Sequence, residues 1–176
     1  WRQADALALP FDDASFDVVA CQFGAMFFPD RVAGYREARR VLRPGAPFVF
    51  TVWDKIGTNV FADDVTRSLA EMFPADPPRF LARTPHGHHD PDRIRAELQA
   101  ASFRHIGIET RTEMSRAPSA HRVAFAYCHG TPLRGEIEAR GNLDAATDRA
   151  VAFIEARHGP GEVAAPIQGL IVTATA

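Results

Sequence analysis

The stretch that decides the fold is residues 3–30, which read QADALALPFDDASFDVVACQFGAMFFPD. Within it, a polar turn at 12–15 precedes the apolar run VVAC at 18–21, which predicts a short strand. Gly24 follows closely, and glycine permits either a positive φ or a close backbone approach. Open α/β sheets bind ligands where their strands end. The sequence therefore predicts a binding site in the residues that follow this strand.

Helical and strand patterns alternate through the rest of the chain. Asp30 can cap a helix over 30–42, whose apolar residues recur on one face and whose last turn is rich in arginine. The run 48–53 is apolar at almost every position, as in a sheet covered by helices on both faces. Further helices are predicted at 59–73, 90–101, 121–128, 132–139 and 144–157, and further strands around 106–108 and at 166–174. The order of elements predicts an α/β fold.

Composition narrows the class of protein. The 176 residues are 46% hydrophobic and 24% charged, with a net charge of −2, as in a globular protein without a broad nucleic-acid-binding face. No apolar run is long enough for a transmembrane helix. The two cysteines, Cys21 and Cys128, predict reduced thiols and a cytoplasmic location.

A set of motifs in fixed order points to a known family. The pattern D-A-x-x-LPF-x-D-x-SFDVV-x-x-x-FG starts at Asp5, and RVLRPG at 40–45 and the strand at 48–53 follow it. Together they resemble the class I S-adenosylmethionine-dependent methyltransferases, and most closely the ubiquinone/menaquinone-biosynthesis group. The similarity is clear over residues 1–54 and looser beyond. It implies an enzyme with a Rossmann-like fold that methylates a small molecule and binds neither nucleic acid nor membrane.

The resemblance also implies a cofactor site for S-adenosylmethionine. The carboxylate of Asp5 would accept from the exocyclic amine of adenine, and the N–H of Ala6 would donate to a ring nitrogen. Alternatively, Asp5 only begins a turn or caps a helix. Gln22 and Phe23 would lie against the cofactor, or would only pack the strand against the next helix. We prefer the adenine role for Asp5, and the two roles of Gln22 and Phe23 are balanced.

Met26 and Phe27 are the candidate substrate contacts. Met26 and Phe27 would face the substrate opening, or would pack into the core at the start of a helix. Relatives that act on quinone precursors carry a basic and an amide residue there, so this apolar pair favours an apolar acceptor instead. No catalytic residue is assigned, because methyl transfer from a sulfonium depends mostly on positioning the nucleophile in line.

The histidine-rich segment 86–90, HGHHD, is a separate candidate. His89 could act as a general base or contact substrate from a cap over the pocket. Metal binding is disfavoured, because closed tetrahedral sites normally draw ligands from two separated elements. We expect no metal, and a solvated loop is the favoured interpretation.

Part of the family pattern is missing. The resemblance implies a seven-stranded sheet whose antiparallel last strand lies between the fifth and the sixth. The Gly-rich turn after the first strand and the acidic residue after the second are not found, so the chain would supply strands three to seven, with residues 1–3 inside the third. We therefore expect a truncated C-terminal portion with an incomplete cofactor site. Within it, 1–58 would form a cofactor-side core, 59–143 a helical cap and strand region, and 144–176 the final helix and strand.

Three functions follow from these observations. The first is methyl transfer to a small molecule. The second is a non-catalytic methyltransferase-like module that forms dimers or larger homo-oligomers through an exposed strand edge. The third is a metal-binding or hydrolytic protein built around 86–90. We rank them in this order.

Overall fold

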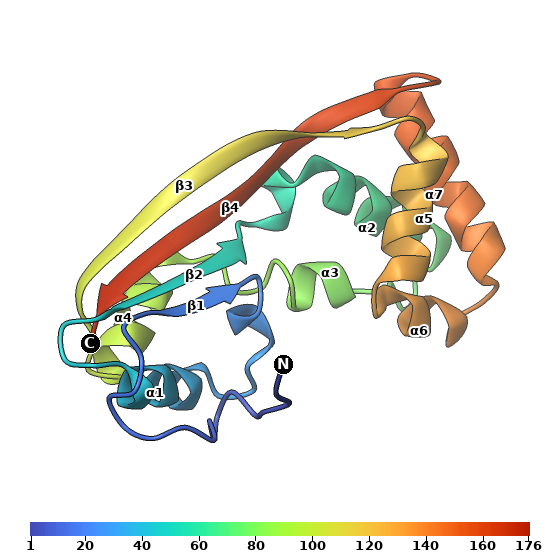
Figure 1. Ribbon diagram of the computed structural model, residues 1–176. Coiled ribbons are helices and arrows are strands. Elements are labelled where there is room, and N and C mark those ends of the chain that lie inside the picture. The colour runs from blue at the N-terminus through green and yellow to red at the C-terminus, as the bar shows by residue number, and fades with distance from the viewer. The chain divides into compact units, whose positions relative to one another are not determined.

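The chain, described over residues 1–176 by a computed structural model, forms two compact units (Figure 1). Unit 1 contains residues 1–54, 88–111 and 169–176, and unit 2 contains residues 55–87 and 112–168. Each unit is therefore discontinuous in sequence. The division into 1–58, 59–143 and 144–176 stays a prediction.

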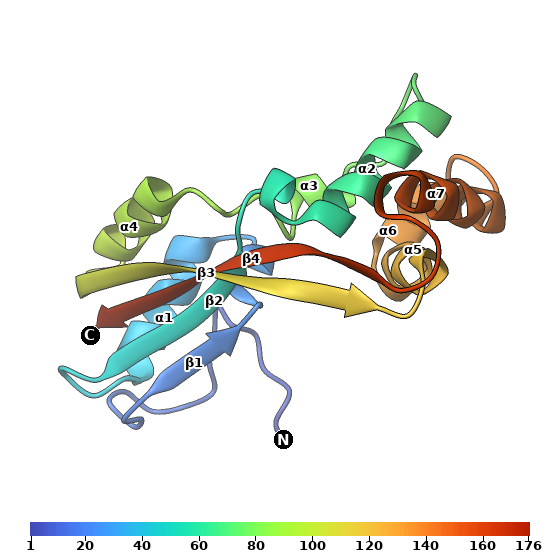
Figure 2. The same ribbon diagram turned by 90° about the horizontal axis from the view of Figure 1, so that it is seen from above.

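A mixed four-stranded sheet has the order β1-β2-β4-β3. The strands are β1 (Val19–Gln22), β2 (Pro47–Trp53), β3 (Arg104–Ala117) and β4 (Val163–Thr175). β1 is parallel to β2, and β2 is antiparallel to β4 (Figure 2). The last strand is thus antiparallel and lies between the second and the third. This confirms the predicted α/β class and the position of the last strand.

Unit 1 contains two α-helices, α1 (Arg31–Val41) and α4 (Pro91–Ala100), and the short 3₁₀ helix η1 (Ala25–Phe27). Asp30 caps α1 by accepting from the N–H of Ala33 at 2.9 Å. Asp90 caps α4 by accepting from the N–H of Asp92 at 2.9 Å, with Pro91 at the first helical position. Both helix starts were predicted correctly, because the cap is a local interaction.

The core of unit 1 lies between the sheet and these helices. Phe48 and Phe50 of β2 are buried, and the ring of Tyr35 on α1 stacks on Phe50 with centroids 5.3 Å apart. Val49 and Thr51 point to the opposite face and are half-buried. The prediction placed helices on both faces, whereas α1 and α4 of this unit lie on the same one (Figure 1).

Unit 2 is mainly helical. Its helices are η2 (Ile56–Thr58), α2 (Val60–Met72), α3 (Phe80–Arg83), α5 (Ala120–Gly130), α6 (Leu133–Glu138) and α7 (Leu143–His158). It also includes β3 from Thr112 onward and β4 as far as Gln168. Apolar side chains from α2, α5, α6 and α7 form one core that includes Leu69, Ala124, Ile137 and Ile154. None of the helices has the length and apolar content that a membrane crossing requires.

Two expectations about local structure were wrong. Residues 1–3 do not form a strand: only an isolated bridge joins Asp5 to Ala8, and Arg2 lies over the ring of Phe11 at 5.6 Å. A strand needs a neighbour for its backbone groups, and none pairs with this segment. No element was predicted between 73 and 90, yet this stretch contains α3, whose N-terminus is capped by Glu136 of α6. The carboxylate accepts from the N–H groups of Arg79 and Phe80 at 2.8 and 3.1 Å.

This distant cap yields a stability prediction. Replacing Glu136 with Ala leaves two N–H groups of α3 without partners, so we expect a loss of about 1–2 kcal/mol in the free energy of unfolding. Urea denaturation and amide exchange at Phe80 measure it. Glu138→Ala on the same helix is the control, because Glu138 pairs only with the exposed Arg134 four residues earlier and should cost less than about 0.5 kcal/mol. Equal losses in the two variants would contradict the capping role.

Candidate functional site at the carboxyl ends of β1 and β2

The parallel strands β1 and β2 end at the same edge of the sheet. Gln22 is the last residue of β1, is exposed, and is level with Thr51 of β2. Phe23 follows Gln22, and β2 ends two residues beyond Thr51 at Trp53. Ligands of open α/β sheets bind outside the carboxyl ends of the strands. This edge is therefore the candidate site, where the sequence placed it.

Phe23 is held in an unusual backbone conformation at this edge. Its φ is +49°, in the left-handed region that costs a non-glycine residue about 1–3 kcal/mol. Its N–H donates to both the carbonyl and the hydroxyl of Thr51, at 3.1 and 3.0 Å. Its ring stacks on Trp53 with centroids 4.0 Å apart and an interplanar angle of 16°. These contacts fix an aromatic pair beside Gln22.

Two glycines make this packing possible. A Cβ on Gly169 of β4 would lie 3.1 Å from the carbonyl oxygen of Val52 and 3.6 Å from the ring of Phe23. A Cβ on Gly24 would lie 2.9 Å from the sulfur of Cys21. Gly24 has a negative φ, so its role is the close approach rather than a left-handed turn. Trp53 and Gly169 were missed by sequence reasoning, because each is far along the chain from Phe23.

The apolar pair after Gly24 divides between core and surface. Met26 is only 5% exposed and packs in the core of unit 1. Phe27 is 52% exposed. Burial raises the pKa of the half-buried Cys21 thiol, so this group is not an activated nucleophile. Phe27 is thus the member of the pair that is accessible to a ligand in this structure.

Asp5 and Ala6 lie in a tight turn. One carboxylate oxygen of Asp5 accepts from the N–H of Leu7 at 2.9 Å, and the carbonyl of Asp5 accepts from Ala8. The other carboxylate oxygen and the N–H of Ala6 have no hydrogen-bond partner in the chain. An exposed acceptor beside a free donor is the pair that an adenine edge requires. The turn and the proposed adenine contact are therefore compatible. No hydrogen bond joins this pair to Gln22 or Phe23.

The segment after this turn is tied to α1 by a pair of charged side chains. Glu37 accepts from the N–H of Leu9 at 2.8 Å. Arg40 contacts Glu37 at 2.8 Å and Asp13 at 2.6 Å, and donates to the carbonyl of Phe11. The hydrogen bond from Arg40 lowers the pKa of the Glu37 carboxyl, so the pair stays ionised at neutral pH. The sequence showed only arginines in the last turn of a helix, not this contact.

The segment 86–90 is not the solvated loop that was expected. His86 is 5% exposed and His88 is 1% exposed. The imidazole Nε2 of His88 is 3.0 Å from the hydroxyl of Tyr35 and 3.6 Å from Glu97, whereas its Nδ1 is buried without a hydrogen-bond partner. Burial, and next the charge of Arg31, lower the pKa of His88 to about 4. His88 is therefore neutral at physiological pH.

His89 is the third histidine of this segment. His89 is half-buried and precedes the cap of α4. No three side chains of the His, Cys, Asp or Glu type are grouped so that they could hold a metal ion. The buried partner of His88 is a tyrosine hydroxyl 53 positions earlier, which no local pattern reveals.

The first 50 residues of the chain match a known protein family. Residues 1–50, which include β1, α1 and the first residues of β2, match the methyltransferase domain family. The match covers the part of the chain that carries the candidate site residues Asp5, Gln22 and Phe23.

Curated methyltransferases also align with this chain. The chain is 29% identical over 119 residues to a demethylmenaquinone methyltransferase of Staphylococcus carnosus, in an alignment covering 62% of this chain and 49% of the relative. The chain thus spans about half the length of the curated relatives it matches.

The fold is shared with two solved structures. A provisionally assigned methyltransferase of Bacillus halodurans superposes with a TM-score of 0.56 at 16% identity, covering 99% of this chain and 76% of that one. Phosphoethanolamine N-methyltransferase 2 of Haemonchus contortus gives 0.50 at 15% identity, covering 97% and 36%. At these identities the likeness concerns the fold alone.

The buried histidine yields a prediction about pH. Between pH 6.5 and 4, His88 takes up a proton in the unfolded chain but not in the folded chain, so its burial destabilises the protein as the pH falls. We expect His88→Gln to remove a loss of at most about 3 kcal/mol over this range, measured by urea denaturation at several pH values. His121→Gln, which removes an exposed histidine of α5, is the control. A wild-type pH slope in His88→Gln would contradict the neutral buried state.

Proposed function

We propose that this chain is part of an S-adenosylmethionine-dependent methyltransferase acting on a small-molecule acceptor. One observation carries the proposal: the segment that matches a methyltransferase domain forms β1, α1 and the start of β2, and its strands end at an edge that presents Gln22 and Phe23. The relative from Staphylococcus carnosus is named for methylating demethylmenaquinone, and the Haemonchus contortus enzyme was solved with S-adenosylhomocysteine. Both support the reaction class and the cofactor.

The residues present fit the cofactor in part. Asp5 has a free carboxylate oxygen and Ala6 a free N–H, and these would hold the adenine edge. Gln22 and Phe23 would lie against the cofactor at the sheet edge. The bound cofactor supplies an electrophilic methyl group, and the chain positions the acceptor in line with it. We propose that these residues form one wall of the site and that further contacts complete it.

The acceptor that suits this edge is an apolar small molecule. Phe27 is exposed and would contact it, whereas Met26 would act through the packing of η1. His89 is the candidate proton acceptor, because it is half-buried and carries an imidazole that can take up a proton near neutral pH. An apolar rim favours an acceptor without the polar groups of quinone precursors.

Binding of S-adenosylhomocysteine tests the proposal. We expect calorimetry on the 176-residue chain to give weak binding, on the order of 0.1–1 mM, with NMR shifts at the amides of Ala6 and Gln22. Asp5→Asn should weaken binding about tenfold, because the oxygen that faces adenine can become a donor. Asp12→Asn, in the neighbouring polar turn, is the control. If the amides of Ala6 and Gln22 do not shift at millimolar ligand, the proposed site is wrong. If the affinity is micromolar, the cofactor site of this chain is complete, contrary to the proposal.

A second function is a non-catalytic module that self-associates. β1 is an edge strand that pairs only with β2, and Val18, just before it, is 53% exposed. An apolar strand edge can pair with a second copy of the chain. This would give a homodimer without any need for cofactor.

The edge can be tested directly. If the module self-associates, sedimentation velocity should show a dimer, and Val18→Lys should shift it to monomer because a charge at a strand edge blocks pairing. Phe27→Lys is the control, since Phe27 is about equally exposed but lies in η1, whereas Val18 directly precedes β1. A wild-type chain that remains monomeric at all concentrations tested would reject this alternative.

A further inference from the structure

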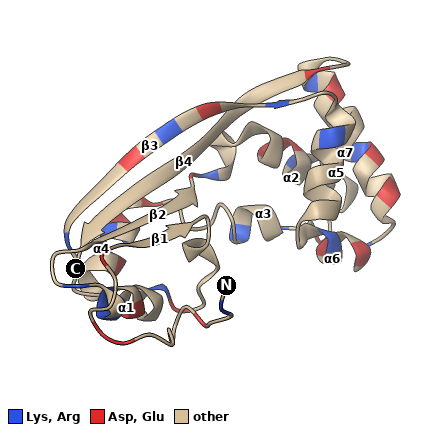
Figure 3. Cartoon of the chain, in the orientation of Figure 1, with Lys and Arg blue, Asp and Glu red and all other residues tan.

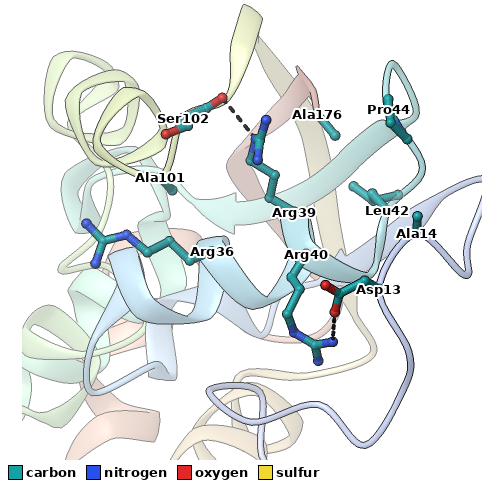
Figure 4. Close-up of a pocket in the computed structure, with 10 residues that line it drawn as sticks. All are labelled: Asp13, Ala14, Arg36, Arg39, Arg40, Leu42, Pro44, Ala101, Ser102 and Ala176. Carbon is teal, nitrogen blue, oxygen red and sulfur yellow. Dashed lines mark hydrogen bonds and ion pairs between the residues drawn. The ribbon is translucent and has the colours of Figure 1, made fainter.

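A hollow of about 450 Å³ lies at the C-terminal end of α1 within unit 1 (Figure 4). α1 starts beyond the carboxyl end of β1 and ends just before β2 begins. Its last turn is therefore at the amino ends of these parallel strands, at the opposite edge from Gln22 and Phe23. The volume is within the range of small-molecule sites, about 300–1,000 Å³. The hollow is thus separate from the edge proposed for methyl transfer.

Two of the arginines that line this hollow have no carboxylate partner. Arg36 donates one N–H to the carbonyl of Ala100 at 3.3 Å, and Arg39 donates its Nε–H to the carbonyl of Ser102 at 3.1 Å. No ion pair engages either guanidinium. The hollow is therefore lined by two arginines without an ion pair, beside the Arg40–Asp13 pair that also lines it.

The other arginines of this helix and of the turn after it are all paired. Arg31 contacts Glu97, Arg40 contacts Glu37 and Asp13, and Arg43 contacts Asp17. The missing partners are therefore confined to the side of the helix that faces the hollow. α1 carries four arginines and one acidic residue, Glu37, which pairs with Arg40 and so leaves the helix with a positive net charge (Figure 3).

We propose that this hollow binds a small diphosphate-type ligand, with Arg36 and Arg39 as its binding residues. A guanidinium has five N–H donors in a fork that matches phosphate oxygens, and each of these uses one in the chain. Their bonds to the end of α4 hold the two heads in place, which reduces the entropy lost on binding. Figure 4 shows Arg39 directed toward Ser102 and Arg36 directed away from it. Because the two heads point in different directions, the proposed ligand carries two phosphoryl groups, one for each guanidinium.

The simpler account is that both arginines only offset the partial negative charge at the C-terminus of α4. That role needs just the bonds to the carbonyls of Ala100 and Ser102. It gives no reason for the chain to bind an added anion. The two accounts therefore differ in the response to pyrophosphate.

Calorimetry of the 176-residue chain with pyrophosphate, at constant ionic strength in sodium chloride, tests the proposal. We expect saturable binding that Arg36→Gln and Arg39→Gln each weaken about tenfold, equivalent to about 1.4 kcal/mol. Arg39→Lys should recover part of the loss, because lysine keeps the charge without the fork. Arg43→Gln, at the same end of α1 but paired with Asp17, is the control and should bind like the wild type.

The results distinguish pyrophosphate binding from simple capping of α4. Far-ultraviolet circular dichroism first establishes that each variant is folded. Binding that is absent in the wild type, or unchanged in Arg36→Gln and Arg39→Gln, would overturn the proposal in favour of simple capping of α4. Inorganic phosphate that binds as tightly as pyrophosphate would overturn the two-headed geometry. Pyrophosphate shifts at the amide of Ser102, and not at Gln22, would support a site distinct from the methyl-transfer edge.

Discussion

The parallel pairing of β1 with β2 is the constraint on which the rest of unit 1 depends. β1 has four residues and pairs along one side only, so its position relies on packing as well as on hydrogen bonds. Tyr35 of α1 packs against its neighbour β2 by contacting Phe48 and Phe50. The resulting register places Gln22 level with Thr51, and Thr51 in turn holds Phe23. The geometry of the candidate site therefore follows from the way the sheet is packed on α1.

A polar network between α1 and α4 adds to this packing. Arg31 and Arg93 both contact Glu97, and Glu97 is 3.6 Å from His88. Burying a cation beside two arginines would be costly, so His88 is neutral. The neutral imidazole can then bond to the hydroxyl of Tyr35, whose pKa is raised by burial. One tyrosine thus joins the aromatic core to the polar network.

The features that the sequence predicted are those set by local interactions. Asp30 and Asp90 lie next to the helices they cap, and the strand before Gln22 is an apolar run. The predicted sheet edge also depends only on where strands end. The α/β class was predicted from the order of helices and strands, and the position of the last strand through family resemblance.

The features that the sequence did not predict depend on partners far along the chain. α3 is capped by Glu136, which comes from another helix. His88 is buried because Tyr35 is there to bond with it. A histidine-rich segment looks hydrophilic until that partner is known. At the candidate site, Phe23 was predicted, but its stacking on Trp53 depends on the pairing of two strands.

The left-handed backbone of Phe23 limits which residues the position can accept. Glycine would relieve the strain, and asparagine would tolerate it, but neither has a ring to cover Trp53. A β-branched residue would suit a strand yet be disfavoured by the positive φ. The aromatic side chain of Phe23 therefore comes with a strained backbone conformation. A substitution that relaxes the backbone therefore removes the flat hydrophobic surface that covers Trp53, and no single residue type supplies both.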